Sequence, residues 1–407
     1  MPEFPPVDDQ LKVILRGSAQ VETEVELRKK LEKSLATGKP LRVKYGIDPT
    51  GFDVHLGHTV PLRKLRQFQE LGHKAVLILG TATAAVGDPS GRDQSRQGLN
   101  AEQIEKNAQT YLKQIAKIID VTIAEVRSNG EWFAKFGFAD MLHLLGQMTV
   151  QQMLERDDFH DRIEKNTPIY LHELLYPLMQ GRDSVEIHAD VELGGTEQLY
   201  NLMVGRDLQR TSGQEPQICL TMPILRGLDG VKKMGKSLGN YIGVNEPPKE
   251  QFGKTMRIPD ELMTEWFTLL TDRTQTEINQ IVAGHPNEAK KLLAGDIVTF
   301  YHGSEAATAT LADWNKQFGG GGKQDPDNIE EVMIPTTKLT AGAFLAVDLM
   351  VETKLCASKG EARRKIEEGA FNYGPDRSKI TDLKATVPIT DGLVIRLGRK
   401  ILRVRLG

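Results

Sequence analysis

Residues 41–58 read LRVKYGIDPTGFDVHLGH, and this stretch decides the fold that we expect. Leu41, Val43 and Tyr45 alternate with polar residues, which is typical of a strand. Glycine and a Pro-Thr-Gly cluster end the strand, and the apolar periodicity that follows predicts a helix beginning near His55. Backbone N–H groups and the positive end of the helix dipole then face the loop. The stretch therefore predicts an anion site.

Two histidines stand at the start of this helix. His55 and His58 are three residues apart, so both can reach one ligand from the first helical turn. Gly57 between them leaves room for a flat base against the backbone. The alternative is a pair of solvated histidines, and an isolated H-x-x-H pair does not exclude it.

Composition limits the class of protein. A chain of 407 residues with 39% hydrophobic and 26% charged residues fits a globular protein of two or three domains. Only Cys219 and Cys356 are present, without a CxxC pair, so a disulfide framework or a thiolate zinc site is not expected. The first ten residues lack a charged and an apolar signal region, and no apolar run has membrane-spanning length. We expect a cytoplasmic protein.

Strand and helix patterns alternate along the first half of the chain. We expect strands at 75–80, 124–128, 191–193 and 218–225, and helices at 22–35, 100–119 and 132–145. This alternation predicts an α/β fold with a doubly wound parallel sheet. The turn Asp88-Pro89-Ser90-Gly91 follows the buried strand 75–80, where such sheets bind ligands, although a plain surface turn is the alternative.

A helix with polar residues on one face follows. Tyr176, Gln180 and Asp183 are spaced four and three apart, so they share a helical stripe. A phenol, an amide and a carboxylate suit a pocket for an ammonium and a hydroxyl group. The alternative is an ordinary amphipathic helix whose polar side faces water.

Two glycine-rich segments come next. Gly194-Gly195 ends a strand and leads into a helix from Thr196, with Gln198 in its first turn. The run RGLDGVKKMGKSLGN at 226–240 places three lysines between glycines. This composition predicts a mobile basic loop that closes over an anion, with a solvated charged surface as the alternative.

Five motifs in this order resemble those of the bacterial tyrosyl-tRNA synthetases. They are HLGH after DPT, GDPSG, Y-x-x-x-Q-x-x-D, GGTEQ and KMGKS. HLGH and KMGKS alone indicate a class I synthetase-like nucleotidyl transferase, and the other three point to tyrosine. The resemblance covers nearly the whole chain. It implies a Rossmann-like class I synthetase core with an S4-like RNA-binding domain at its C-terminus.

The resemblance also implies roles for single residues. Asp88, Tyr176 and Gln180 would bind the α-ammonium of tyrosine, Asp183 the phenol, and Gln198 would lie near the carboxyl group. The full implied tyrosine set is Asp48, Asp88, Tyr176, Gln180, Asp183 and Gln198. The implied ATP contacts are Gly46, Asp48, Gly57, Gly195, Glu197, Leu225 and Lys236. The implied catalytic residues, which stabilise the phosphates, are Thr50, His55, His58, Lys233, Lys236, Ser237, Arg92 and Arg96.

The reaction implied needs no general base, because a carboxylate is already a nucleophile at neutral pH. Tyrosine and ATP would give tyrosyl-adenylate and pyrophosphate, and a ribose hydroxyl of tRNA(Tyr) would then accept the tyrosyl group. We expect Mg²⁺ on the phosphates and no protein-bound metal. A catalytically inactive RNA-binding relative should have lost His55, Lys233 or Lys236. An enzyme for another amino acid, such as tryptophan, should lack Asp183 and Gln180.

Several positions depart from the family pattern. Lys44 stands where one large branch has a second phenol-reading tyrosine, so phenol recognition would depend more on Asp183. Glu197 replaces the usual Asp, and Gly181-Arg182 replaces Ala-Tyr in the polar helix.

The chain is expected to divide into four segments: a catalytic domain at 1–243, a helical domain at 244–318, a linker at 319–337 and an S4-like domain at 338–407. Residues 338–407 carry fourteen Lys or Arg and eight Asp or Glu, which gives +6, while the rest of the chain is −9. This asymmetry predicts an RNA-binding surface, with Lys359, Arg363, Arg364 and Lys365 as its basic cluster. A small α+β module with solvated lysines is the alternative. The resemblance further implies a homodimer, with Met148–Leu154 near the interface.

Overall fold

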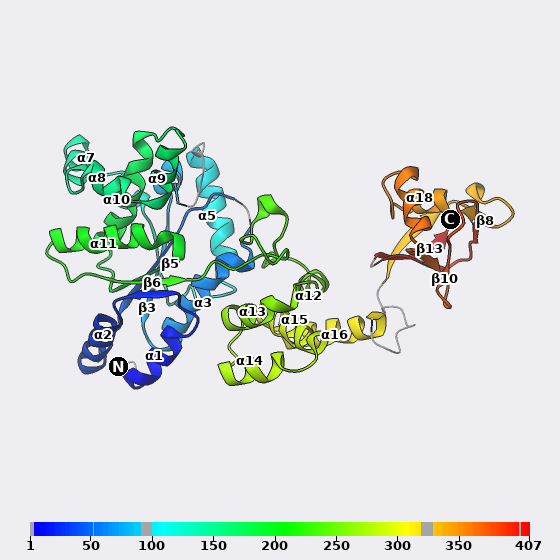
Figure 1. Ribbon diagram of the computed structural model, residues 1–407, viewed down its shortest axis with the longest axis horizontal. Helices are drawn as coiled ribbons and strands as arrows, with labels where there is room; N and C mark the ends of the chain where they lie inside the picture. Colours follow the sequence, from blue (N-terminus) through cyan, green and yellow to red (C-terminus); the bar gives the residue numbers. More distant parts are fainter. Residues whose placement is uncertain (1–3, 52, 91–99, 319–328, 399) are drawn as a thin grey trace. The chain divides into compact units, whose positions relative to one another are not determined.

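The structure is a computed structural model that describes residues 4–51, 53–90, 100–318, 329–398 and 400–407 (Figure 1). It divides into two compact units, residues 1–304 and 305–407, and each is described by itself. Within the described residues, no helix is both long and apolar enough to span a bilayer.

A mixed sheet forms the centre of the first unit. In the described part of the chain it has six strands, in the order β1-β6-β5-β2-β3-β4. They are β1 (Gln20–Glu22), β2 (Arg42–Ile47), β3 (Lys74–Leu79), β4 (Glu125–Ser128), β5 (Val191–Gly195) and β6 (Ile218–Met222). The neighbours from β6 to β4 pair in parallel, which confirms the doubly wound parallel sheet. The edge strand β1 was not predicted, and it pairs antiparallel with β6.

Helices lie on both sides of this sheet (Figure 1). Those before residue 243 are α1 (Val7–Leu15), α2 (Glu24–Thr37), α3 (Leu56–Glu70), α4 (Thr83–Val86), α5 (Ala101–Ile115), α6 (Gly130–Phe133), α7 (Phe138–Leu145), α8 (Val150–Leu154), α9 (Asp157–Glu164), α10 (Leu171–Glu186) and α11 (Leu199–Thr211), with the 3-10 turns η1 (Thr196–Gln198) and η2 (Lys236–Leu238). Their ends follow local rules. Thr23, for example, caps α2 by accepting from the backbone N–H of Glu26, and Gly38 ends it at φ +68°.

The two faces of the sheet are covered by different helices because side chains alternate along a strand. Val43 and Leu77 point into the core that holds Leu65 and Phe68 of α3. On the opposite face, Lys44 reaches α10, where its ammonium donates to the Gln180 carbonyl at 2.8 Å. Helix α11 packs against β5 and β6.

The strand order reverses between β2 and β5. From β2 the chain proceeds outward through β3 and β4, and from β5 it proceeds the other way through β6. In doubly wound sheets, ligands bind beyond the carboxyl ends of the strands at such a point. The predicted stretch 41–58 forms β2 and the start of α3, so it lies directly at this position.

Some predicted elements differ in length from the observed ones. The helix expected at 132–145 is divided into α6 and α7, because Gly137 is extended and its N–H donates to Asp140 at the start of a new helix. The helix expected at 100–119 ends at Ile115. The remaining expected strands and helices of this unit are confirmed within a few residues, although a 3-10 turn precedes α11.

A helical segment follows residue 243. It contains α12 (Pro248–Thr255), η3 (Asp260–Leu262), α13 (Met263–Leu270), α14 (Gln275–Val282) and α15 (Pro286–His302). Trp266 and Phe267 are fully buried in the same hydrophobic core as Val43 and Leu65. The predicted helices are therefore present, and they share one core with the sheet. The division at residue 243 itself stays a prediction.

The second unit is small and mixed. Its described residues form a five-stranded sheet in the order β10-β9-β12-β13-β7 and a two-stranded sheet of β11 and β8. Its elements are α16 (Ser304–Phe318, which begins at the boundary), β7 (Glu330–Ile334), η4 (Thr336–Lys338), β8 (Ala343–Leu345), α17 (Ala346–Glu352), α18 (Lys359–Glu367), β9 (Phe371–Tyr373), β10 (Ser378–Lys379), β11 (Thr386–Pro388), β12 (Val394–Leu397) and β13 (Lys400–Leu406). Strand β7 corrects the predicted linker, because residues 330–334 pair in parallel with β13.

Candidate active site

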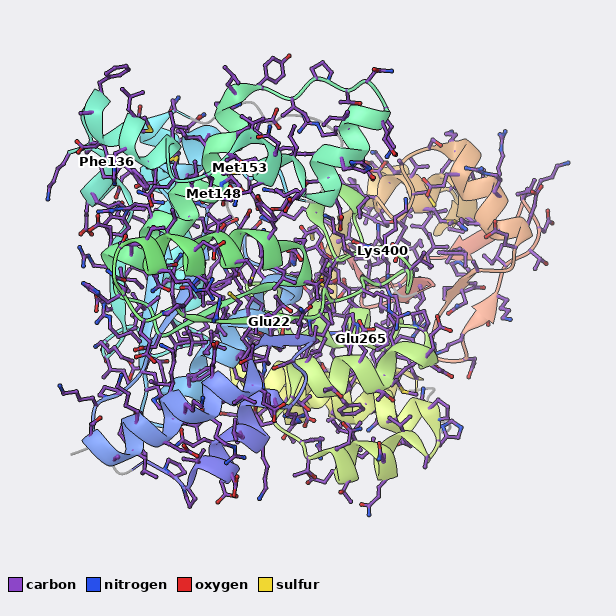
Figure 2. All side chains as sticks on the ribbon, turned by 60° about the vertical axis from the view of Figure 1, so that its left-hand side comes forward. Glu22, Phe136, Met148, Met153, Glu265 and Lys400 are labelled. Atoms are coloured by element: carbon purple, nitrogen blue, oxygen red, sulfur yellow. The ribbon has the colours of Figure 1, made fainter. Side chains whose placement is uncertain are left out.

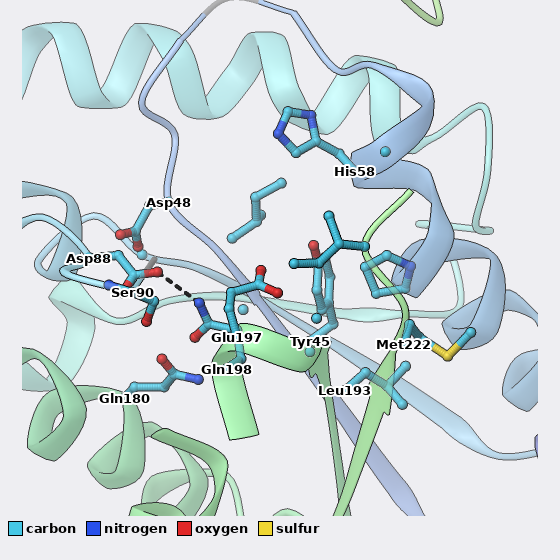
Figure 3. Close-up of a pocket in the computed structure, with 18 of the residues that line it drawn as sticks. Tyr45, Asp48, His58, Asp88, Ser90, Gln180, Leu193, Glu197, Gln198 and Met222 are labelled. Carbon is cyan, nitrogen blue, oxygen red and sulfur yellow. Dashed lines mark hydrogen bonds between the residues drawn. The ribbon is translucent and has the colours of Figure 1, made fainter. Parts of the chain in front are cut away.

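A pocket of about 340 Å³ lies at the switch point between β2 and β5. Its lining includes most of the residues that the motifs singled out (Figure 3). From the tyrosine and catalytic sets these are Asp48, Thr50, His55, His58, Asp88, Tyr176, Gln180, Asp183, Gln198 and Lys233, and from the ATP set Gly46, Gly57, Gly195, Glu197 and Leu225. Segments far apart in the sequence are thus brought together. The individual roles of these residues stay predictions.

Asp183 is the buried carboxylate at one end of the pocket. It is 4% exposed on α10, and its oxygens accept from Trp132 Nε1 at 3.0 Å and from Asn129 Nδ2 at 3.3 Å. Burial raises its pKa to about 7, although Lys44 and these two donors oppose the rise. The carboxylate is held in place, and a carboxylate is a strong acceptor for a hydroxyl group.

Asp48 lies beside the same end. Its Oδ1 accepts from Thr83 Oγ1 at 2.7 Å and its Oδ2 accepts from the Tyr176 hydroxyl at 3.0 Å. A Cβ on Gly80 would lie 2.0 Å from Oδ1, so only glycine at that position leaves room for the carboxylate. Burial, together with the charges of Asp48 and Asp88, raises the pKa of Tyr176, which therefore remains a hydrogen-bond donor.

A third carboxylate, that of Asp88, faces an amide group from η1, the turn before α11. The Gln198 amide donates to Asp88 Oδ2 at 2.8 Å, drawn as a dashed line in Figure 3. Asn201, one turn further along, donates to the side-chain oxygens of Gln198 at 3.0 Å and Gln180 at 3.2 Å. Two carboxylates and two amide oxygens at one end of the pocket can bind an ammonium group.

Lys44 does not line the pocket. It is fully buried on the face of β2 that contacts α10, and its ammonium lies 2.9 Å from Glu192 Oε1 and donates to Ser184 Oγ at 2.8 Å. The side chain therefore connects β2 to α10 and does not provide a polar group to the pocket.

The other end of the pocket contains the two histidines. His55 is the N-cap residue of α3, and its ring stacks on that of His58 with centroids 3.7 Å apart. Burial, then His58 and Lys236, lowers the pKa of His55 to about 2. Burial and Lys236 lower the pKa of His58 to about 4. Within the described residues, His55 Nδ1 is buried without a hydrogen-bond partner. These rings are neutral at pH 7 and able to donate to an anion.

The basic loop at residues 226–240, called the lysine loop below, lies near the histidine end of the pocket. Lys233 lines the pocket, while Lys236 and Ser237 do not. A Cβ on Gly51 would lie 3.2 Å from Lys236 Nζ, so this ammonium lies close to the loop that follows β2. Burial lowers the pKa of Lys236. Arg92 and Arg96 lie outside the described residues.

Glu197 also lines the pocket. Burial raises the pKa of its carboxyl group. A Cβ on Gly195 would lie 2.3 Å from Glu197 Oε2, so this side chain folds back over the glycine turn. In the described residues, no group of three or more His, Cys, Asp or Glu is arranged to hold a metal ion.

Sequence reasoning missed several residues that hold the site in place. Asn129 and Trp132 follow strand β4, and polar residues after a parallel strand are a usable signal. Asn201 is three residues after Gln198, so helical spacing could have indicated it. Thr83, in contrast, has no local signal.

Comparison with known proteins agrees with this geometry. The sequence family described as "tRNA synthetases class I (W and Y)" matches residues 36–319, which is more than half of the chain. The doubly wound sheet, the pocket at its switch point and this match define a class I tRNA synthetase.

Comparison with individual relatives identifies the family within this class. The tyrosine–tRNA ligase of Symbiobacterium thermophilum is 49% identical over 98% of this chain and 97% of its own length. The ligase of the same name from Oleidesulfovibrio alaskensis is 50% identical over 97% of this chain and 98% of its own. The chain therefore belongs to the family of bacterial tyrosine–tRNA ligases.

Solved structures support the fold of the first unit. A C-terminally truncated mitochondrial tyrosyl-tRNA synthetase of Aspergillus nidulans superposes with a TM-score of 0.62 at 23% identity, covering 77% of this chain and 94% of its own. The tyrosyl-tRNA synthetase of Archaeoglobus fulgidus, complexed with L-tyrosine, gives a TM-score of 0.61 at 23% identity, covering 75% and 100%. The predicted class I synthetase fold is confirmed.

Proposed function

We propose that this chain is a tyrosine–tRNA ligase that activates tyrosine with ATP and transfers it to tRNA(Tyr). The observation that carries the proposal is the single pocket at the switch point. One end has a buried, hydrogen-bonded carboxylate and an ammonium subsite, and the other has two neutral histidines at a helix N-terminus. The 49% identity with a named tyrosine–tRNA ligase over nearly the whole chain supports it.

The first step joins the tyrosine carboxylate to the α-phosphorus of ATP. A carboxylate oxygen attacks, the bond to the bridging oxygen breaks, and pyrophosphate leaves with its electron pair. His55, His58, Lys233 and Lys236 would donate to the phosphate oxygens as charge develops on them. The phosphates would also be bound by Thr50, Ser237, Arg92 and Arg96. Mg²⁺ would arrive with ATP as part of the substrate.

Tyrosine would lie with its ring along α10. Its phenol would donate to Asp183, and its ammonium would lie among Asp88, Gln180 and Gln198. The phenol of Tyr176 and the carboxylate of Asp48 would complete that subsite. A phenylalanine would leave the Asp183 carboxylate without the hydroxyl, and a buried polar group left unpaired in this way is costly; tyrosyl enzymes are a standard example of this selectivity.

The second step needs the tRNA. The second unit would bind it, since Lys359, Arg363, Arg364 and Lys365 lie on α18, whose N-terminus is capped by Ser358 as the sequence predicted. Lys359 pairs with Asp348 and Lys365 with Glu368, so within the described residues Arg363 and Arg364 are the two cations of the four without an ion-pair partner. Replacing both arginines by Gln should reduce tRNA charging and leave tyrosine-dependent pyrophosphate exchange unchanged; an equal loss of both would contradict the role.

We further propose a homodimer that uses the surface around Met148–Leu154, and a location in the cytoplasm. Leu144 of α7, Met153 of α8 and Leu178 of α10 belong to one small hydrophobic cluster, against which Met148 packs; both methionines are labelled in Figure 2. The same elements expose Phe138, Val150 and Leu171 at 80%, 59% and 86%. Exposed apolar side chains on these helices support an interface there. Sedimentation at micromolar concentration should give twice the 45.3 kDa chain mass, whereas a monomer would refute the dimer.

The experiment that tests the function is amino-acid-dependent ATP–pyrophosphate exchange, followed by charging of tRNA(Tyr). We expect exchange with tyrosine and at most trace exchange with phenylalanine or tryptophan. Exchange with tryptophan instead of tyrosine would mean a related ligase. No exchange with any of the three, despite ATP binding, would contradict the enzymatic function and leave the RNA-binding alternative.

A further inference from the structure

Arg156 is a buried arginine outside the predicted site. It is 4% exposed at the junction of α8 and α9, and its guanidinium lies over the ring of Phe159, 4.8 Å from the centroid. Asp158 accepts from its Nε at 2.9 Å and from Nη2 at 2.7 Å. This bidentate pair fixes the plane of the guanidinium.

The remaining guanidinium hydrogens point toward the pocket residues. Nη2 donates to Ser90 Oγ at 3.1 Å, in the turn that contains Asp88. Nη1 donates to Asn201 Oδ1 at 3.0 Å. Asn201 is itself fully buried, so its hydrogen bonds cannot be replaced by water.

Arginine is only a donor, and this fixes the orientation of the amide groups beyond it. Since Asn201 Oδ1 accepts from Arg156, its Nδ2 must face the two glutamines. Gln180 and Gln198 accept from that Nδ2 at 3.2 and 3.0 Å, closer than its third acceptor, Ser90 Oγ at 3.3 Å, so their own amide nitrogens point away. Those nitrogens donate to Glu192 at 3.1 Å and to Asp88 at 2.8 Å, which are carboxylates and accept only.

We propose that Arg156 is a positioning residue for the ammonium subsite: through Asn201 it holds the oxygens of Gln180 and Gln198 in the orientation that a substrate ammonium needs. The inference rests on the proposed function, because the ligand is the α-ammonium of tyrosine. If either amide turned over, a donor –NH₂ would replace an acceptor oxygen, and a cation would be repelled instead of bound.

The test compares three ligands that differ at the ammonium. Dissociation constants are measured by calorimetry for tyrosine, for tyrosinol, which keeps the ammonium but lacks the carboxylate, and for 3-(4-hydroxyphenyl)propanoate, which lacks the ammonium. In Arg156→Gln we expect tyrosine and tyrosinol to bind about tenfold more weakly, as for a buried acceptor that loses its donor. The propanoate and ATP should bind as in the wild type.

Arg162 provides a matched control. It is 2% exposed on α9, the helix whose N-cap is Arg156, and it forms a buried pair with Glu173. Arg162→Gln removes a buried arginine of the same kind, but none of its hydrogen bonds in the described residues reaches the pocket residues. It should lower thermal stability and leave all three dissociation constants unchanged. Arg156→Lys, which keeps a donor-only cation, should restore part of the affinity.

A double variant keeps the proposal testable if stability falls. In an Asn201→Ala background, Arg156→Gln should weaken tyrosine binding no further, because the path through Asn201 is already absent. Additive losses, or equal losses for the propanoate, would overturn the proposal. If the wild type binds none of the three ligands, the proposed function itself is contradicted. If the wild type binds them and the variants do not behave as expected, only the role of Arg156 is contradicted.

Discussion

The two ends of the pocket differ in how completely their polar groups are paired. At the end with Asp183, the carboxylate has two donors and Asn201 joins the amide groups into a continuous network. At the other end, His55 and His58 stack on each other, and His55 Nδ1 has no partner among the described residues. The polar groups at the Asp183 end are therefore paired before a ligand binds, whereas His55 at the other end is not fully paired.

This difference fits the two substrates. A rigid, fully paired end suits an amino acid that must be distinguished from close analogues, because selectivity depends on fixed acceptors. An end with buried neutral imidazoles and a nearby lysine is electrostatically unfavourable by itself. A bound polyphosphate would offset this unfavourable positive charge. Its interactions with these groups would then be strongest where negative charge develops in the reaction.

The largest effect is expected at the paired end. Asp183→Asn places an amide –NH₂ against the Trp132 or Asn129 donor and removes the negative charge. We expect kcat/KM for tyrosine in pyrophosphate exchange to fall by about 1,000-fold, with KM for ATP unchanged. Asp161→Asn, at an exposed position of α9, is the control and should have no effect. A decrease in kcat/KM of less than fivefold would mean that Asp183 does not bind the phenol hydroxyl of tyrosine.

An intermediate effect is expected at the incomplete end. His55→Ala removes one phosphate donor without disturbing the Asp183 network, so we expect the rate of adenylate formation to fall by about 100-fold. The dissociation constant of tyrosine should not change, as measured by calorimetry. His160→Ala, on an exposed side chain, serves as the control. Weakened tyrosine binding in His55→Ala would show that the two ends are not separate.

The smallest effect concerns pH. Burial raises the pKa of Asp183 to about 7, so this group gains a proton as pH falls through 7 and loses part of its capacity to accept. Tyrosine should therefore bind more weakly with falling pH, by up to about tenfold per unit below 7. His58 does not titrate in this range, because its pKa is about 4. A flat profile between pH 5.5 and 8 would contradict the assignment, and Asp183→Asn should give one.

Much of this site could be predicted because its signals are local. The strand, loop and helix of residues 41–58, and the helical spacing of Tyr176, Gln180 and Asp183, depend on neighbours within one or two turns. These residues indeed line a single pocket. The alternation along β2 also implies that Lys44 points away from Val43 and Tyr45, toward the opposite face.

The rest could not be predicted, because it depends on contacts between distant segments. Trp132 and Asn129 reach Asp183 across more than fifty residues, and Asn201 reaches Ser90 across 111. The partner of Lys44 is Glu192, which is adjacent only because β2 and β5 are neighbours at the switch point. Local patterns do not specify such pairs.

The core shared by the sheet and helices α12–α15 has a consequence for unfolding. Trp266 is completely buried there, and its indole N–H donates to the Arg226 carbonyl at 3.2 Å, just ahead of the lysine loop. Helices that bury their apolar face in a common core cannot melt by themselves, so residues 4–304 should lose structure as one cooperative block. The indole of Trp266 is consequently an intrinsic optical probe whose signal reports the integrity of the sheet as well.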